Sequence, residues 1–315
     1  MPSETPVIEI RGLRKSYGDH EAVRGIDISV NAGECFAFLG PNGAGKTTTV
    51  EVLEGFHEKS GGEVSVLGHD PWGAPSSWRE RIGIVLQESA PEPGLSVREC
   101  LHLYAGYYTH PRDVEETIAL VDLADQSDQR SATLSGGQRR RLDVALALIG
   151  DGELLFLDEP TTGFDPTARR GAWDVIEGLK ALGKTIFLTT HYMDEAERLA
   201  DRVAVIAGGV IVAEGSPQSL GGRQDADAQI TFALPPGANE SDLPGAFAGR
   251  LSPVGRKLLL PSSAVAADLH ELSGWALDRG FELHDLEVKR PTLEDVYVQL
   301  TAEAAADEHE NGVTS

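Results

Sequence analysis

The stretch that most constrains this chain covers residues 40–48 and reads Gly-Pro-Asn-Gly-Ala-Gly-Lys-Thr-Thr. An apolar run at 35–39 precedes it and a helical pattern at 49–53 follows, which is the context that a G-x-x-x-x-G-K-[ST] motif requires. The glycines let the backbone fold around an anion, and the N–H groups of the next helix point at that anion. Lys46 would reach the β- and γ-phosphates of a nucleotide, and the Thr47 hydroxyl suits Mg²⁺. The alternative is a flexible turn that happens to contain a lysine.

Length and charge narrow the class of protein. With 315 residues the chain is long enough for two domains. Asp and Glu number 50 against 27 Lys and Arg, and the net charge of −23 disfavours a DNA or RNA partner. The polar, acidic N-terminus does not resemble a signal peptide, and no apolar run approaches the roughly 20 residues of a spanning helix. We therefore expect a cytosolic protein that serves a membrane, if at all, through a partner.

Two further apolar strands are predicted to end in polar side chains. The run at 154–157 is typical of a buried parallel strand, and Asp158 and Glu159 follow it directly. Asp158 is placed to hold Mg²⁺ through water, whereas Glu159 points to the other face and could act as general base for an attacking water. His191 stands just past the strand at 185–190, so we expect it to contact the γ-phosphate.

Two other residues are weaker candidates. Tyr17, at the end of a predicted strand, could stack on the adenine of a nucleotide, although simple packing is the more common role of such a tyrosine. Gln87 ends a predicted strand and could reach a metal or a water at the γ-phosphate if that strand lies beside the phosphate-loop strand. Without that neighbour, Gln87 is simply a glutamine at the end of a strand, with no functional role.

A second anion site is predicted around residues 134–138, which read Leu-Ser-Gly-Gly-Gln. Ser135 is a good N-cap, but two glycines in a first turn weaken a helix by about 1 kcal/mol each. Bare N–H groups at a helix start bind anions, so this turn would be a second phosphate-binding element. The alternative is a solvent-exposed helix start, with the following arginines as a solvated face.

With these motifs in place, the chain resembles the ATP-binding subunit of an ATP-binding-cassette (ABC) transporter. The phosphate loop, Gln87, Leu-Ser-Gly-Gly-Gln, Asp158-Glu159, Phe164-Asp165 and His191 occur in the family's order, over about residues 5–217. The residues before Asp165 read Thr-Gly-Phe where many relatives have leucine.

The resemblance implies an α/β fold: a phosphate-loop NTPase (RecA-like) core with an antiparallel β subdomain and an α-helical subdomain at about 88–150. It also implies two copies that sandwich two ATP molecules, with the signature turn of one copy closing on the ATP of the other. Glu159, His191 and Gln87 would be catalytic, and Thr47, Gln87 and Asp158 would serve Mg²⁺. The nucleotide would be held by Tyr17, Gly40, Pro41, Asn42, Gly43, Ala44, Gly45, Lys46, Thr47, Thr48, Ser135, Gly136, Gly137 and Gln138.

The remaining sequence predicts a nucleotide-binding domain at 1–222, an accessory α+β domain at 223–300 and a disordered tail at 301–315. The Thr-Leu-Glu-Asp-Val-Tyr ending of the accessory domain is similar to cassettes of ABC-2-type exporters, including the antibiotic-resistance branch. Those cassettes pair with a separate six-helix permease, which would place this chain on the inner face of the cell membrane, with residues of about 88–110 facing the permease.

Two other classes of function agree less well with the sequence. A soluble cassette ATPase acting on the ribosome or DNA would be expected to carry tandem cassettes, coiled-coil inserts or basic arms, and this sequence has one cassette and a charge of −23. A metabolic phosphoryl transferase has no use for the Leu-Ser-Gly-Gly-Gln turn. The sequence therefore favours an ATPase that drives export of a drug, antibiotic or lipid-like compound.

Overall fold

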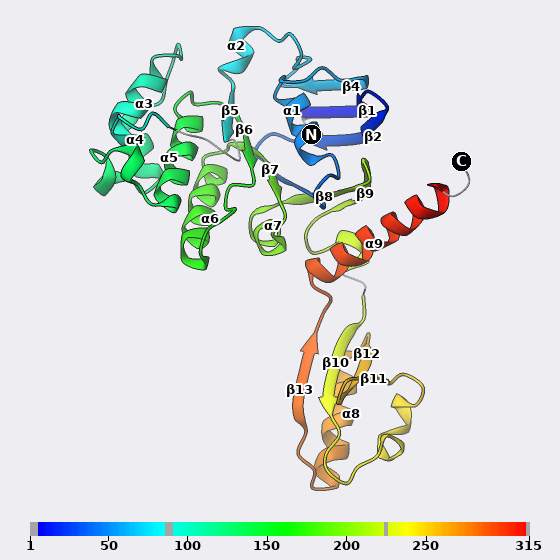
Figure 1. Cartoon of the computed structure of the whole chain (residues 1–315). Coiled ribbons are helices and arrows are strands. Elements are labelled where there is room, and N and C mark those ends of the chain that lie inside the picture. The colour runs from blue at the N-terminus through cyan, green and yellow to red at the C-terminus, as the bar shows by residue number, and fades with distance from the viewer. Residues whose placement is uncertain (1–5, 86–90, 224–225, 313–315) are drawn as a thin grey trace, which may run out of the picture. The chain divides into compact units, whose positions relative to one another are not determined.

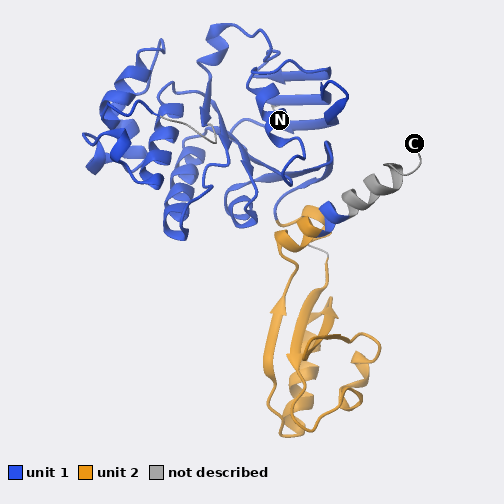
Figure 2. Cartoon of the chain, in the orientation of Figure 1, with its two compact units in different colours: residues 1–217, 299–315 blue, residues 218–298 orange. Residues whose placement is uncertain are grey.

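The computed structural model describes residues 6–85, 91–223 and 226–312, and their side chains up to residue 302 (Figure 1). The chain forms two compact units, one of residues 1–217 with 299–315 and one of residues 218–298 (Figure 2). None of the described helices is long and apolar enough to cross a lipid bilayer.

A six-stranded sheet forms the centre of the first unit, in the order β5-β6-β7-β3-β8-β9. All neighbours are parallel except β8 and β9, which form an antiparallel hairpin. The strands are β3 (Cys35–Leu39), β5 (Ile82–Val85), β6 (Leu154–Asp158), β7 (Thr185–Thr190), β8 (Arg202–Ala207) and β9 (Val210–Gly215). Because β3 and β7 are buried along their whole length, they read as continuous apolar runs with little alternation.

Successive residues of these strands face opposite sides and belong to two separate cores. Phe36, Phe156 and Phe187 face the first core, where their rings pack together. This core is covered by the antiparallel sheet β2-β1-β4, by α1 and by Trp78 of α2. The elements are β1 (Ile8–Tyr17), β2 (His20–Val30), β4 (Gly61–Val66), α1 (Lys46–Leu53) and α2 (Ser76–Arg79).

Helices cover the other face of the sheet (Figure 1). They are α3 (Val97–Ala105), α4 (Val114–Leu120), α5 (Gly136–Leu148), α6 (Pro166–Ala181) and α7 (Met193–Leu199), with the short turns η1 (Ala124–Gln126) and η2 (Ser131–Thr133). Ser96 and Glu99 form a capping box at the start of α3. Asp165 caps α6, with Pro166 at its first position.

The second unit packs α8 (Val265–Asp278) on an antiparallel sheet of order β11-β12-β10-β13. Its strands are β10 (Ala228–Ala233), β11 (Ser252–Val254), β12 (Lys257–Ser262) and β13 (His284–Lys289), and its short turns are η3 (Leu220–Gly222), η4 (Glu240–Asp242) and η5 (Gly245–Phe247). Ile230, Phe232 and Leu272 are fully buried between sheet and helix, so the unit has its own hydrophobic core.

The last helix, α9 (Leu293–Gly312), corrects one prediction. The sequence analysis predicted disorder from residue 301, but the helix continues to Gly312. The segment is polar and acidic, which suggested disorder, yet it is rich in Ala and Glu, which have high helix propensity. A continuing helix adds each of these residues without a new nucleation cost.

Candidate nucleotide-binding and hydrolysis site

The phosphate loop joins β3 to α1 in a conformation that only glycine fits at two positions. A Cβ on Gly40 would lie 2.4 Å from the Ile206 carbonyl oxygen. Gly45 has φ 105° and a Cβ there would lie 2.6 Å from the Ala22 carbonyl oxygen. Gly45 is also the N-cap of α1 and offers no side chain to cap it, so the first N–H groups of the helix remain available to an anion.

Lys46 lies within this loop and is only 7% exposed. Its ammonium donates hydrogen bonds to the carbonyl oxygens of Gly40 (2.6 Å) and Pro41 (3.1 Å). Burial lowers the pKa of Lys46, and the nearby carboxylates of Glu159 and Asp158 oppose that shift. The positive charge of the loop is therefore placed in the field of the two acids.

The order of the strands brings these acids to the loop. β7 pairs with β3 on one side and with β6 on the other, so all three strands end at the same edge of the sheet. Thr189 of β7 joins the two acids: its hydroxyl donates to Asp158 Oδ1 and accepts the backbone N–H of Glu159 at 3.1 Å. No motif in the sequence marks Thr189 as part of the site, because its contacts depend on the pairing of β6 with β7.

Glu159 has an unusual backbone, with φ 45° for a residue that carries a side chain. Such strain, of order 1–3 kcal/mol, is found mainly where function needs it. Glu159 Oε1 lies 3.3 Å from Nδ1 of His191, and its Oε2 accepts a hydrogen bond from Thr162 Oγ1 at 3.0 Å. The carboxylate is thus fixed at the strand end, with His191 beside it, as a general base would need to be.

Arg140 holds this strained segment and was missed by the sequence analysis. One interpretation of the sequence placed the arginines of α5 on a solvated face, but the Arg140 residue is only 8% exposed. It donates hydrogen bonds to the carbonyl oxygens of Asp158 (2.7 Å), Glu159 (3.3 Å) and Pro160 (3.0 Å). Burial lowers the pKa of this guanidinium, with Asp143 and Asp158 opposing the shift. Three similar arginines in a row gave no sequence signal that the middle one would be buried.

The Leu-Ser-Gly-Gly-Gln turn begins α5. Ser135 is the N-cap and forms a capping box with Gln138, whose side chain accepts the Ser135 N–H at 2.9 Å. Ser135 and Gly136 are exposed, and a Cβ on Gly136 would meet no atom within 4 Å. Across the part of the chain that the structure describes, no hydrogen bond or ion pair joins residues 135–138 to the phosphate loop. The turn therefore has an open N-terminal side that a separate anion could approach.

Of the two weaker candidates, the structure describes Tyr17 but not Gln87. Tyr17 ends β1 with 44% of its surface exposed; the Lys15 ammonium lies 4.8 Å from its ring centroid and the His57 ring packs edge-on at 5.9 Å. Gln87 lies outside the described residues. The strand that precedes it, β5, pairs with β6 and is separated from β3 by β6 and β7. The strand of Gln87 therefore does not lie beside the phosphate-loop strand, as the sequence-based argument for Gln87 required.

A parallel sheet with a phosphate loop after β3, two acids after β6 and a histidine after β7 defines a phosphate-loop nucleotide-binding protein. Comparisons with known proteins are more specific. A family model described as "ABC transporter" matches residues 23–162, and one described as "ABC transporter domain-containing protein-like, C-terminal domain" matches residues 228–292.

Two curated relatives are similar over most of the chain. The daunorubicin resistance ATP-binding protein DrrA3 of Streptomyces coeruleorubidus is 38% identical over 307 residues, which cover 94% of this chain and 96% of that protein. The Nod factor export ATP-binding protein I of Cupriavidus pinatubonensis is 44% identical over 226 residues, 70% of this chain and 69% of the relative. Among solved structures, cbiO1 of Clostridium perfringens, part of the transporter complex cbiONQ, has a TM-score of 0.62 and 28% identity, covering 69% of this chain and 90% of that one.

The chain therefore belongs to the family of ATP-binding subunits of ABC transporters, and the RecA-like α/β fold predicted from the sequence is confirmed. As a member of that family it binds ATP and is an ATPase.

The contacts of Arg140 lead to a prediction about turnover. Arg140→Met removes three charged hydrogen bonds to buried or partly buried carbonyl oxygens, each worth about 1.5–3 kcal/mol in typical proteins. We expect the steady-state ATPase rate at saturating ATP to fall at least about ten-fold, because the Glu159 backbone loses its support. The control is Arg139→Met on the exposed side of the same helix turn. Equal rates and equal melting temperatures for the two variants would show that Arg140 does not position the acids.

Proposed function

We propose that this chain is the ATPase subunit of an exporter, that it works as a pair of identical copies, and that a separate membrane permease carries the substrate. The observation that carries this proposal is the similarity to the daunorubicin resistance protein, which spans 94% of the chain and includes the accessory region after residue 217. A shared cassette alone would point to the family, whereas a shared C-terminal region points to this branch of it.

The proposed chemistry assigns one role to each residue at the strand ends. The loop of residues 40–48 holds the β- and γ-phosphates, and Tyr17 stacks on adenine. Glu159 accepts the proton of the attacking water, and His191 holds the γ-phosphate. Gln87 is proposed to contact the metal and the attacking water; it lies outside the described residues.

Mg²⁺ fits the oxygen donors that this chain presents. Thr47 is exposed at the first turn of α1, and Asp158 ends β6 with a hydrogen bond from Thr189, an arrangement suited to a hard cation that keeps several waters. Bound there with the nucleotide, the ion would neutralise charge on the β- and γ-phosphate oxygens.

The second copy is needed because of the signature turn. Residues 135–138 form an exposed helix start with open space around Gly136, and we propose that their anion is the γ-phosphate of the ATP bound by the other copy. Two such copies related by a two-fold axis would complete two sites at once.

The exporter assignment also places the chain on the inner face of the cell membrane, through a permease of about six helices per subunit. We propose that the cassette covers residues 1–222 and the accessory domain 223–300. The compact-unit boundary at residues 217 and 218 and the family match at 228–292 support this division. The net charge of −23 speaks against a role on nucleic acid.

The general-base assignment predicts the behaviour of Glu159→Gln. The amide keeps the shape of the side chain but accepts no proton, so we expect turnover to fall by about 100-fold or more while Mg·ATP still binds. The variant should accumulate as an ATP-bound dimer, which light scattering after size exclusion would detect. A variant that hydrolyses ATP at the wild-type rate would remove Glu159 from this role.

The export assignment is tested in cells that express the chain together with the membrane protein encoded beside it. We expect higher resistance to, and lower accumulation of, at least one compound from a panel of daunorubicin and other amphipathic antibiotics. The effect should disappear with Glu159→Gln. Unchanged accumulation for every compound, or ATP-dependent uptake into the cell, would contradict the proposal.

A further inference from the structure

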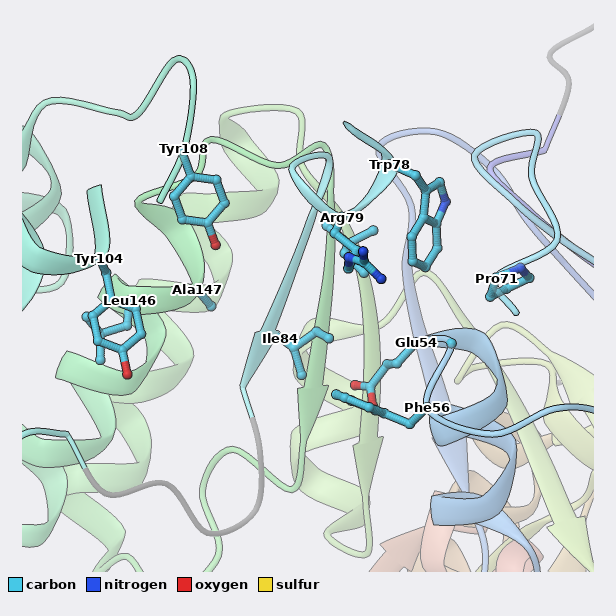
Figure 3. Close-up of a pocket in the computed structure, with 12 residues that line it drawn as sticks. Glu54, Phe56, Pro71, Trp78, Arg79, Ile84, Tyr104, Tyr108, Leu146 and Ala147 are labelled. Carbon is cyan, nitrogen blue, oxygen red and sulfur yellow. The ribbon is translucent and has the colours of Figure 1, made fainter. Parts of the chain in front are cut away.

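A cavity of about 310 Å³ lies in the first unit, at the end of α1 that is away from the phosphate loop (Figure 3). It is bordered by the end of α1, by α2, by β5, and by α3 and α5 with the segment after α3. The residues that matter for its chemistry are Glu54, Trp78, Arg79, Ile84, Tyr104 and Tyr108. None of the roles assigned above uses this cavity.

Glu54 is the unusual group of the cavity. It forms the C-cap of α1 and is only 6% exposed, and Figure 3 shows its carboxyl group directed into the cavity toward Ile84. Its Oε1 has no hydrogen-bond partner among the described residues. Buried acids are normally paired, because an unpaired buried charge is expensive. A carboxyl group left in this state is therefore suited to a partner that comes from outside.

The charges around Glu54 increase the need for such a partner. Burial, together with the smaller effects of the carboxylates of Asp158 on β6 and Glu51 on α1, raises the pKa of Glu54 to about 8. Arg79 of α2 also lines the cavity, but within the described part of the chain no ion pair joins it to Glu54. An arriving cation would restore the ionised form and end the isolation of the carboxyl group.

The walls of the cavity suit a long apolar stem. Trp78 is 2% exposed and its indole N–H is already bonded to the Val66 carbonyl oxygen at 2.8 Å, so it offers only its ring. Ile84, Leu146 and the rings of Tyr104 and Tyr108 continue the apolar lining. Lysine and arginine combine an apolar stem with a charged end, and guanidinium also stacks on aromatic rings. An apolar side chain would fit the walls but leave Glu54 unpaired.

We propose that this cavity is a recognition site for one basic side chain, arginine or lysine, on a cytoplasmic segment of the permease, and that Glu54 pairs with it. The proposal rests on the permease assignment made above and goes beyond it by naming the residue that selects the partner. Tyr104 and Tyr108 belong to the segment of about 88–110 that the sequence predicted to face the permease, whereas Glu54 lies outside that segment.

A second copy of this chain is a poorer occupant for two reasons. The eight residues of α1 separate Glu54 from Lys46, so the cavity is about 12 Å from the phosphate loop, where the second copy is expected. Each copy also carries a net charge of −23, which opposes the approach of another copy to an acidic site.

The cation site is tested first without any permease, with benzamidine as probe and benzamide as its neutral counterpart. Calorimetric titration of the full-length protein should show benzamidine binding at least about ten-fold more tightly than benzamide, a difference of about 1.4 kcal/mol. Glu54→Gln should abolish this preference, and the variant is checked by its melting temperature. The matched control is Glu51→Gln, a half-buried acid beside His57 one turn away on the same helix, which should keep the preference. Equal binding of both compounds to the wild type, or a preference that survives in Glu54→Gln, overturns the assignment.

The identity of the occupant is tested with the membrane protein encoded beside this chain. Glu54→Lys should reduce co-purification of that protein at least about ten-fold, and an acidic substitution at one basic residue of its cytoplasmic segments should restore it. Undiminished co-purification with Glu54→Lys overturns the site but leaves the exporter assignment standing. If the wild-type chain retains no permease at all, the exporter assignment and the proposed occupant both fail, and the benzamidine result is unaffected.

Discussion

The position of β7 between β3 and β6 is the constraint on which the rest of this molecule depends. Parallel pairing brings the ends of these three strands to one edge, although the phosphate loop lies more than a hundred positions before the two acids in the sequence. The pairing is stabilised by burial on both faces, where alternate residues belong to two separate cores. The phosphate loop, the two acids and the histidine are neighbours for this reason.

The edge of the sheet also carries strain that the surrounding structure must hold. Glu159 adopts a left-handed backbone, and its N–H is held by Thr189 while the carbonyl oxygens around it are held by Arg140. A buried guanidinium with three carbonyl partners is costly unless all the bonds are made, so the arrangement has one low-energy geometry. The α5 helix supplies both this arginine and, one turn earlier, the signature serine. The helix thus connects the signature turn to the segment that carries the two acids.

Local signals explain which parts could be predicted from sequence. The strand, turn and helix around the phosphate loop and the N-cap at Ser135 depend on residues close together in the chain, and each was predicted correctly. The family resemblance rested on the order of the motifs and is confirmed. The burial of Arg140, the bridging role of Thr189 and the isolation of Glu54 depend on tertiary packing, which leaves no periodic pattern. The helix after residue 300 was not predicted, because the polar and acidic composition of this stretch suggested disorder, although its Ala and Glu residues favour a helix.

The two ends of α1 lie at two different sites. Its first turn follows the phosphate loop, and its C-cap, Glu54, lines the cavity that we assign to the partner, so one short helix reaches both. We propose that the nucleotide site is incomplete in one copy, because the exposed signature turn would bind the ATP held by the other copy. If two copies are needed to complete each site, turnover requires the dimer, and transport depends on that turnover.

The most direct test mixes two inactive variants. Lys46→Ala disables the phosphate loop and Ser135→Arg disables the signature turn, so each variant alone should be inactive. If the turn acts on the ATP of the other copy, a mixed dimer retains one intact site, and an equimolar mixture should recover up to about one quarter of the wild-type ATPase rate. A mixture as inactive as its components, together with loss of ATP affinity in the Ser135→Arg monomer, would show that the turn serves its own chain and would contradict the account.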